Sequence, residues 1–145
     1  MICRNRTLVA LVSVLLLVAG CSDFHKFPLA SVEGTVLCDG QPIPFAVVYF
    51  VPVQEGESPV IGKSGQGITD KDGKFSISTY RPGDGAVIAK HTIRVAPSSS
   101  TDPNCKADLS HTKVLQTVQV TESDNVFRIE VPRRNKRSKL MIPED

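Results

Sequence analysis

Apolar and polar positions alternate along much of the chain after residue 31, and this period of two predicts β-strands. In the first such segment, one face carries the apolar or small residues Val32, Gly34, Val36 and Cys38. Alternation of this kind is typical of a strand with one buried face. Residues 45–53 are apolar at nearly every position, which predicts a central strand covered on both faces.

Five further strands are expected at 66–69, 75–78, 87–95, 113–121 and 125–131, separated by segments rich in Gly, Pro, Asp and Ser. Asp39-Gly40 and Asp70-Lys71-Asp72-Gly73 are expected to form tight turns, because these residue types accept turn geometry at little cost. No segment keeps a helical period. Seven short strands in about 100 residues predict an all-β sandwich.

The composition agrees with one turn-rich β-domain. The chain has 145 residues, ten Gly, ten Pro and no Trp. This length allows one domain with a single hydrophobic core.

The amino-terminal segment has the pattern of an export signal. Arg4 and Arg6 precede an apolar stretch at 8–19, interrupted by Ser13. Twelve helical residues span about 18 Å, less than the ~30 Å of bilayer hydrocarbon. Residues 1–20 are therefore interpreted as a signal peptide rather than a transmembrane helix.

The end of this segment resembles the lipobox of bacterial lipoproteins. It is Val18-Ala19-Gly20-Cys21. The resemblance implies that Cys21 is joined to diacylglycerol, that the signal is then removed, and that a further acyl chain such as palmitate is often added. Several chains on one cysteine anchor stably, whereas one chain holds only marginally. The alternative is an ordinary secretory signal, with Cys21 as a bystander.

Residues 21–30 are expected to be a lipidated tether with membrane lipid as partner. The protein would then lie in the cell envelope, facing the periplasm. By the sorting rule known for enteric bacteria, Ser22 favours the outer membrane, although Asp23 weakens that inference.

The positive charge of the chain lies at its two ends. Loss of Arg4 and Arg6 with the signal lowers the 17 basic residues to 15, equal to the 15 acidic residues. The segment 133–145 carries a basic cluster that consists of Arg133, Arg134, Lys136, Arg137 and Lys139. It is expected to be a disordered, solvated tail. Binding to anionic lipid or to an anionic envelope polymer is the alternative, and export makes a nucleic-acid partner a poor interpretation.

An ordered set of short motifs in residues 31–132 is similar to the carboxypeptidase regulatory-like, or transthyretin-like, domains of bacterial lipoproteins. The motifs are Val32-x-Gly34-x-Val36, Asp39-Gly40-x-Pro42, Ala46-x-Val48-x-Phe50-x-Pro52, Thr69-Asp70-x-x-Gly73-x-Phe75 and His91-x-Ile93-x-Val95. The resemblance implies a seven-stranded, prealbumin-like Greek-key β-sandwich. That family shares no catalytic residues. The related hydroxyisourate hydrolases end in Tyr-Arg-Gly-Ser, whereas this chain ends in Met141-Ile142-Pro143-Glu144-Asp145, so we expect no enzyme activity.

No candidate for metal, cofactor or nucleophilic chemistry has a complete set of residues. The Asp70–Gly73 turn resembles the start of a calcium loop, but the later oxygen ligands are missing at the required spacing. His25, His91 and His111 are widely separated and have no spaced partner. His91 is interpreted as a hydrogen-bonded edge residue, and the serines 98–100 as loop composition. We therefore expect no metal and no cofactor.

Cys38 and Cys105 could form a disulfide in an oxidising envelope. Closing a loop of 67 residues would stabilise the fold by roughly 4 kcal/mol in the chain-entropy treatment. Both thiols could equally be free.

Two functional hypotheses remain. The first is a non-catalytic structural or protein-interaction module with an unknown envelope protein as partner. The second is a carbohydrate- or peptide-binding module that uses the loops 54–65 and 97–110. Sugar sites usually carry exposed aromatic residues, and with Tyr49 and Tyr80 as its tyrosines and no Trp the chain favours the first hypothesis.

Overall fold

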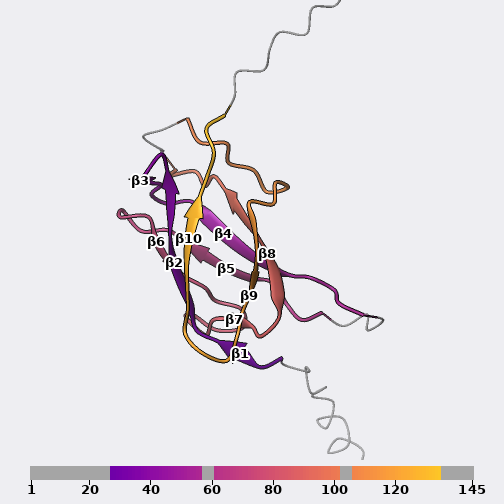
Figure 1. Ribbon diagram of the computed structural model, residues 1–145. Helices are drawn as coiled ribbons and strands as arrows, with labels where there is room; N and C mark the ends of the chain where they lie inside the picture. Colours follow the sequence, from indigo (N-terminus) through magenta and orange to yellow (C-terminus); the bar gives the residue numbers. More distant parts are fainter. Residues whose placement is uncertain (1–26, 57–60, 102–105, 135–145) are drawn as a thin grey trace, which may run out of the picture.

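Ten β-strands make up the regular structure of residues 27–56, 61–101 and 106–134, the part of the chain that this computed structural model describes (Figure 1). The described residues contain no helix. The strands are β1 (Leu29–Ala30), β2 (Val32–Cys38), β3 (Gln41–Pro42), β4 (Val47–Pro52), β5 (Gly65–Ile68), β6 (Lys74–Ser76), β7 (Ala86–Val87), β8 (Lys90–Ala96), β9 (Gln116–Gln119) and β10 (Asn125–Glu130). Seven were expected. The additional strands β1, β3 and β7 have two residues each, too few to produce a periodic pattern.

One sheet has the order β5-β4-β8-β9, with antiparallel pairs throughout. Phe50 of β4 lies opposite Ile93 of β8 and Gly65 of β5. The expectation that the apolar segment 45–53 forms a central strand is confirmed, since β4 has a neighbour on each side.

The second sheet is built around β2. Strand β10 runs parallel to β2, and all residues of β10 are paired. On the other edge of β2, β6 pairs antiparallel with the first half of the strand and β3 with its end. Gly34 lies between Phe127 of β10 and Phe75 of β6. A Cβ atom at Gly34 would clash with the carbonyl oxygen of Phe127 and lie 2.6 Å from Cζ of Phe75. This glycine is therefore required by a close approach of neighbouring strands.

The hydrophobic core lies between the two sheets and is centred on Phe50. Its ring centroid lies 6.2 Å from Phe75, 5.6 Å from Phe127 and 5.8 Å from His91. The first sheet contributes Val48, Phe50, Ile93 and Val95, and the second contributes Val32, Val36, Phe75 and Ile129. The two sheets thus form an all-β sandwich, as the period-two pattern predicts.

The described chain begins and ends at opposite ends of the sandwich (Figure 1). At one end, β1 pairs with β7. The paired residues Leu29 and Ala30 therefore belong to the folded unit, although the segment 21–30 was expected to be a tether. At the other end, Arg133 bridges to Ala107 and its side chain forms an ion pair with Asp39. The first residues of the basic segment therefore belong to the folded unit.

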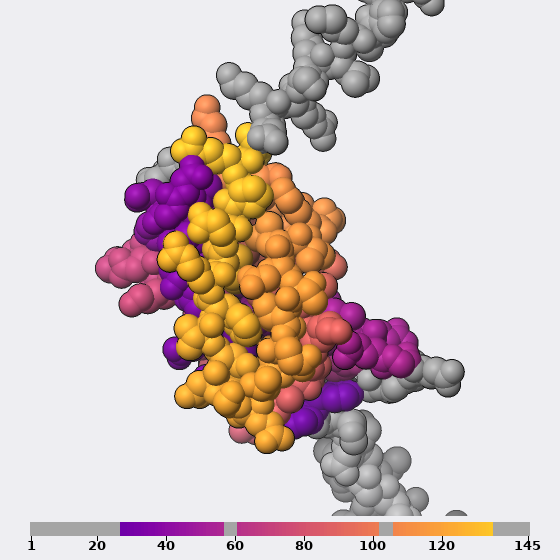
Figure 2. Space-filling view, viewed as in Figure 1, coloured from indigo at the N-terminus to yellow at the C-terminus, as the bar shows by residue number. Residues whose placement is uncertain are grey.

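The surface in Figure 2 is dominated by the late part of the chain. The orange and yellow segments, which include β9 and β10, cover most of the face in view. Exposed positions of β10 are Val126, Arg128 and Glu130, and the buried positions include Ile129. Ile129 and Val131 are both fully buried, so this side of the segment 125–131 faces the core.

Candidate functional site

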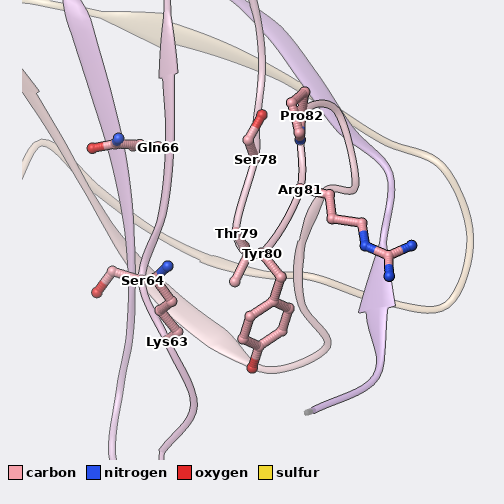
Figure 3. Close-up of a pocket in the computed structure, with 8 residues that line it drawn as sticks. All are labelled: Lys63, Ser64, Gln66, Ser78, Thr79, Tyr80, Arg81 and Pro82. Atoms are coloured by element: carbon pink, nitrogen blue, oxygen red, sulfur yellow. The ribbon is translucent and has the colours of Figure 1, made fainter. Parts of the chain in front are cut away.

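A shallow pocket of about 400 Å³ lies beside Tyr80, and we call it the Tyr80 pocket. Figure 3 shows the side chains that line it: Lys63, Ser64, Gln66, Ser78, Thr79, Tyr80, Arg81 and Pro82. They come from two segments, 63–66 and 78–82. The pocket is therefore built by parts of the chain that are distant in sequence.

A short β-bridge holds these two segments together. Gln66 donates its backbone N–H to the carbonyl oxygen of Ser78 at 2.9 Å, and Ser78 donates back to Gln66 at 2.8 Å. Segment 63–66 runs into β5, and segment 78–82 follows shortly after β6. The bridge fixes their spacing, since both backbone hydrogen bonds must be satisfied together.

The carboxylate of Asp84 shapes the second segment. One oxygen accepts the N–H of Thr79 at 2.7 Å, and the other accepts those of Tyr80 at 3.0 Å and Arg81 at 2.7 Å. Burial by itself raises the pKa of Asp84, but these backbone donors outweigh burial and lower the pKa below its ordinary value. The loop is therefore organised around an ionised carboxylate that is directed at its own backbone.

The polar groups of the Tyr80 pocket include two cations. The Nζ of Lys63 lies 5.9 Å from the centroid of the Tyr80 ring, and in the view of Figure 3 the Arg81 side chain extends away from Lys63. No carboxylate of the described residues lines the pocket. The remaining groups are hydroxyls, an amide and a proline ring, so the pocket can offer charge and hydrogen bonds to a bound molecule.

The Tyr80 pocket lies at the end of the sandwich where the described chain begins. The N–H of Phe27 donates to the Tyr80 hydroxyl at 3.4 Å. Gly62 lies so close to the ring of Phe27 that a Cβ there would be 3.3 Å from it, and 3.1 Å from Val87 of β7. Segments 27–30, 62–63, 80 and 85–87 thus meet at this end.

Several residues singled out from the sequence lie outside the described residues. They are Cys21, His25, Cys105, Lys136, Arg137 and Lys139. Cys38 is described: it is 1% exposed and takes part in a disulfide. The partner lies outside the described part of the chain, so the Cys38–Cys105 pairing stays a prediction.

The interpretation of His91 as an edge residue is wrong. Strand β8 lies between β4 and β9, and His91 is completely buried. Its Nε2 lies 2.8 Å from the carbonyl oxygen of Val87, and its Nδ1 is buried without a hydrogen-bond partner. A period of two shows which face of a strand a residue occupies. It does not show whether that strand has a neighbour on both edges, as β8 has in β4 and β9.

His111 is exposed and lies apart from His91. Its ring centroid lies 5.8 Å from that of Tyr49, and its carbonyl oxygen accepts a long hydrogen bond of 3.5 Å from Arg94. The two histidines are therefore not brought together. In the part of the chain that the structure describes, no group of three or more His, Cys, Asp or Glu residues could hold a metal ion.

The Asp70 turn is a capped hairpin. Asp70 Oδ1 accepts the N–H of Asp72 at 2.8 Å and that of Lys74 at 2.9 Å, while Gly73 takes a φ of 72°. The predicted tight turn is confirmed. The carboxylate of Asp72 contacts Lys71 at 2.8 Å.

The two loops proposed for ligand binding have different positions. The loop 54–65 contributes Lys63 and Ser64 to the Tyr80 pocket. In the loop 97–110, the hydroxyls of Ser98 and Thr101 donate to the carbonyl oxygen of Phe45, so this part braces a turn. Sequence reasoning missed Gln66 and residues 78–82 as site residues. Tyr80 beside Arg81 was the signal that could have drawn attention to them.

No helix among the residues that the structure describes is long and apolar enough to cross a membrane.

Comparisons with known proteins give limited similarity. No protein-family model matches the chain, and no curated protein matches it. A DUF3823 family protein from Parabacteroides merdae ATCC 43184 has a solved structure that is similar with a TM-score of 0.42 and 16% identity, over 73% of this chain and 47% of that one. A 9R-lipoxygenase from Cyanothece PCC8801 gives a TM-score of 0.39 and 14% identity, over 88% of this chain and 20% of that one. The chain therefore matches less than half the length of either protein.

Proposed function

We propose that the protein is a membrane-anchored lipoprotein of the cell envelope whose β-sandwich acts as a non-catalytic structural or protein-interaction module. The observation that carries this proposal is the placement of Cys21 directly after a charged and apolar signal pattern and six positions before Phe27. Lipid on Cys21 would hold the sandwich at the membrane through this short segment.

The geometry of the first described residues supports a close attachment. Phe27 is held by Tyr80, and β1 is paired with β7. Six residues reach about 20 Å when fully extended. The anchored sandwich would therefore stand close to the headgroups, with the β1 end toward them.

The strand order supports a prealbumin-like Greek-key topology as the finer description of the fold. The sheets have the orders β5-β4-β8-β9 and β6-β2-β10, and β2 and β10 are parallel although they are about 90 residues apart. Such an arrangement needs long connections that cross between the two sheets. It is the fold that the resemblance to carboxypeptidase regulatory-like domains implies.

The chemistry of the described side chains supports a non-catalytic role. Among the described residues, no carboxylate or histidine lines the Tyr80 pocket, and the buried His91 lies in the core. Lys63 and Tyr80 are groups of the type that can act as an acid or a base, but no histidine or carboxylate of the described residues lines the pocket to orient them. A structural or interaction role needs only the rigid sandwich.

Metabolic labelling with a fatty-acid analogue tests the anchor. The wild-type chain is expected to carry the label, the Cys21→Ser variant to lose it, and the Ser22→Ala variant, as a matched control, to keep it. Label that remains on Cys21→Ser would overturn the proposal. Separation of inner from outer membranes by density then tests the expected outer-membrane location.

A binding module for carbohydrate or peptide is the second candidate, and the Tyr80 pocket favours it. Glycan-array and peptide-array binding by the lipidated chain in uncharged detergent micelles tests this function. Specific binding that is lost in a Tyr80→Ala variant, and kept in a Tyr49→Ala variant, would place this candidate before the first.

A further inference from the structure

We propose that the Tyr80 pocket binds a phosphate group, carried either by a lipid headgroup or by a small soluble molecule. Lys63 and Arg81 supply the charge, and hydroxyl and amide groups also line the pocket. Guanidinium and ammonium groups are the usual partners of phosphate in proteins. The proposal names a ligand class for the pocket, and the lipid source alone rests on the proposed membrane anchor.

The two cations lack a carboxylate partner in the described residues. Five other cations of the described chain do have one: Lys71, Lys90, Lys113, Arg128 and Arg133. Lys63 instead approaches the face of Tyr80. The charges of Lys63 and Arg81 are therefore available to an anion.

The acidic residue nearest to Arg81 in sequence is Asp84, and its carboxylate binds backbone N–H groups. Both oxygens of Asp84 accept backbone N–H groups of residues 79–81 at distances from 2.7 to 3.0 Å. The same hydrogen bonds fix the backbone that carries Arg81. The loop thus presents a cation on a rigid support, which reduces the entropy lost when a ligand binds.

The position of the pocket matches a phosphate source at the membrane. Phe27 contacts the pocket through the Tyr80 hydroxyl, and Cys21 is six residues away. If Cys21 is acylated, its tether of about 20 Å keeps Lys63 and Arg81 within reach of the headgroups. Each cation near an anionic surface strengthens membrane binding.

Calorimetric titration of the full lipidated protein in uncharged detergent micelles tests the proposal in two arms. One arm adds glycerol 1-phosphate, and the other adds phosphatidylglycerol to the micelles. The Lys63→Gln/Arg81→Gln variant is expected to bind about 30-fold more weakly in the arm that gives binding. The matched control, Lys71→Gln/Lys74→Gln, removes the same charge at the Asp70 turn and is expected to bind like the wild type.

The two arms distinguish the sources. Binding of glycerol 1-phosphate that is lost in the pocket variant identifies a soluble phosphate site, and this arm does not depend on acylation. Binding of phosphatidylglycerol alone, lost in the same variant, identifies a headgroup site. Equal weakening in the control variant, or no binding in either arm, would overturn the proposal. Melting temperatures of the variants that equal that of the wild type would show that weaker binding does not come from unfolding. The single variants Lys63→Gln and Arg81→Gln provide the same check with one charge removed at a time.

Discussion

Single residues around Phe50 show how closely the two sheets pack. Gly34 has an ordinary φ, yet a side chain there would meet both Phe75 and the backbone of β10. Gly40 presents the opposite case: its φ is 74°, and a Cβ would meet nothing within 4 Å. The first glycine is required by packing and the second by backbone conformation.

Gly34→Ala is expected to destabilise the fold by about 3 kcal/mol, because the packed strands β6 and β10 must separate to admit a methyl group. Gly40→Ala should cost only about 1 kcal/mol, the conformational penalty of a left-handed residue. Chemical denaturation of both variants measures the difference. Equal losses would contradict the close approach at Gly34.

Burial in the core disfavours the protonated, charged form of His91. Burial lowers its pKa below 6.5, and the hydrogen bond to Val87 offsets this only in part. As the pH falls below 6.5, the unfolded chain therefore takes up this proton before the folded chain does. Acidification through this range favours unfolding.

The free energy of unfolding is expected to fall by up to about 1.4 kcal/mol per pH unit as the pH drops from 6.5 toward the folded pKa of His91. In a His91→Gln variant this part of the slope should disappear, whereas in the His111→Gln variant, at an exposed position, it should remain. Urea unfolding at pH 7.5, 6.5 and 5.5 compares the three proteins. An unchanged slope in His91→Gln would show that His91 does not titrate on unfolding.

At the scale of elements, short hydrogen-bonded segments position the Tyr80 pocket. The bridge between Gln66 and Ser78 joins β5 to the chain after β6, and Asp84 holds the loop that follows. Thr79 adds a hydroxyl bond of 2.7 Å to the carbonyl oxygen of Gly85. Because the lowered pKa of Asp84 reflects bonds to its ionised form, its contribution is present above pH 3.9 and is lost as the pH falls through the lower folded pKa.

Asp84→Ala is expected to destabilise the protein by about 2 kcal/mol at pH 7, since three backbone donors lose a charged acceptor. Below about pH 3 the difference from the wild type should shrink, because the wild-type carboxyl is then becoming protonated. Thermal unfolding at both pH values measures this. The Asp124→Ala variant, at an exposed turn position, controls for the loss of one negative charge and should unfold like the wild type.

At the scale of the whole molecule, the end opposite Phe27 joins distant parts of the chain. Arg134 donates its N–H to the carbonyl oxygen of Lys106 at 2.7 Å, and the side chain of Arg133 pairs with Asp39. Cys38 is adjacent to Asp39, and Cys105 is adjacent to Lys106. These contacts favour Cys105 as the disulfide partner of Cys38.

Alkylation of the unfolded protein is expected to add two groups at Cys38 and Cys105 only after reduction. Under oxidising conditions, a Cys105→Ala variant should lose about 4 kcal/mol of stability, because the unfolded chain is no longer closed across 67 residues. Peptide mass spectrometry and denaturation measure the two effects. Alkylation of both cysteines without reduction would exclude the bond, and reduced wild-type protein is the matched stability control.

The sequence by itself determined the features that depend on neighbouring residues. The period of two located the longer strands, and the Asp70 turn followed from local hydrogen bonds between Asp70 and residues 72 and 74. The signal and the anchor at Cys21, which stay predictions, also depend on a continuous stretch of chain. These features are local, because strand period, turn chemistry and signal patterns act over a few residues.

Only the tertiary structure decided which of these elements became neighbours. It placed β9 beside β8 and so enclosed His91, it paired the two-residue strands β1 and β7, and it brought segments 63–66 and 78–82 together at Tyr80. None of these contacts leaves a periodic signal in sequence, because each depends on the packing of segments that are separated along the chain. The cations Lys63 and Arg81 became one site for the same reason: the site exists only where the folded strands bring them to the same pocket.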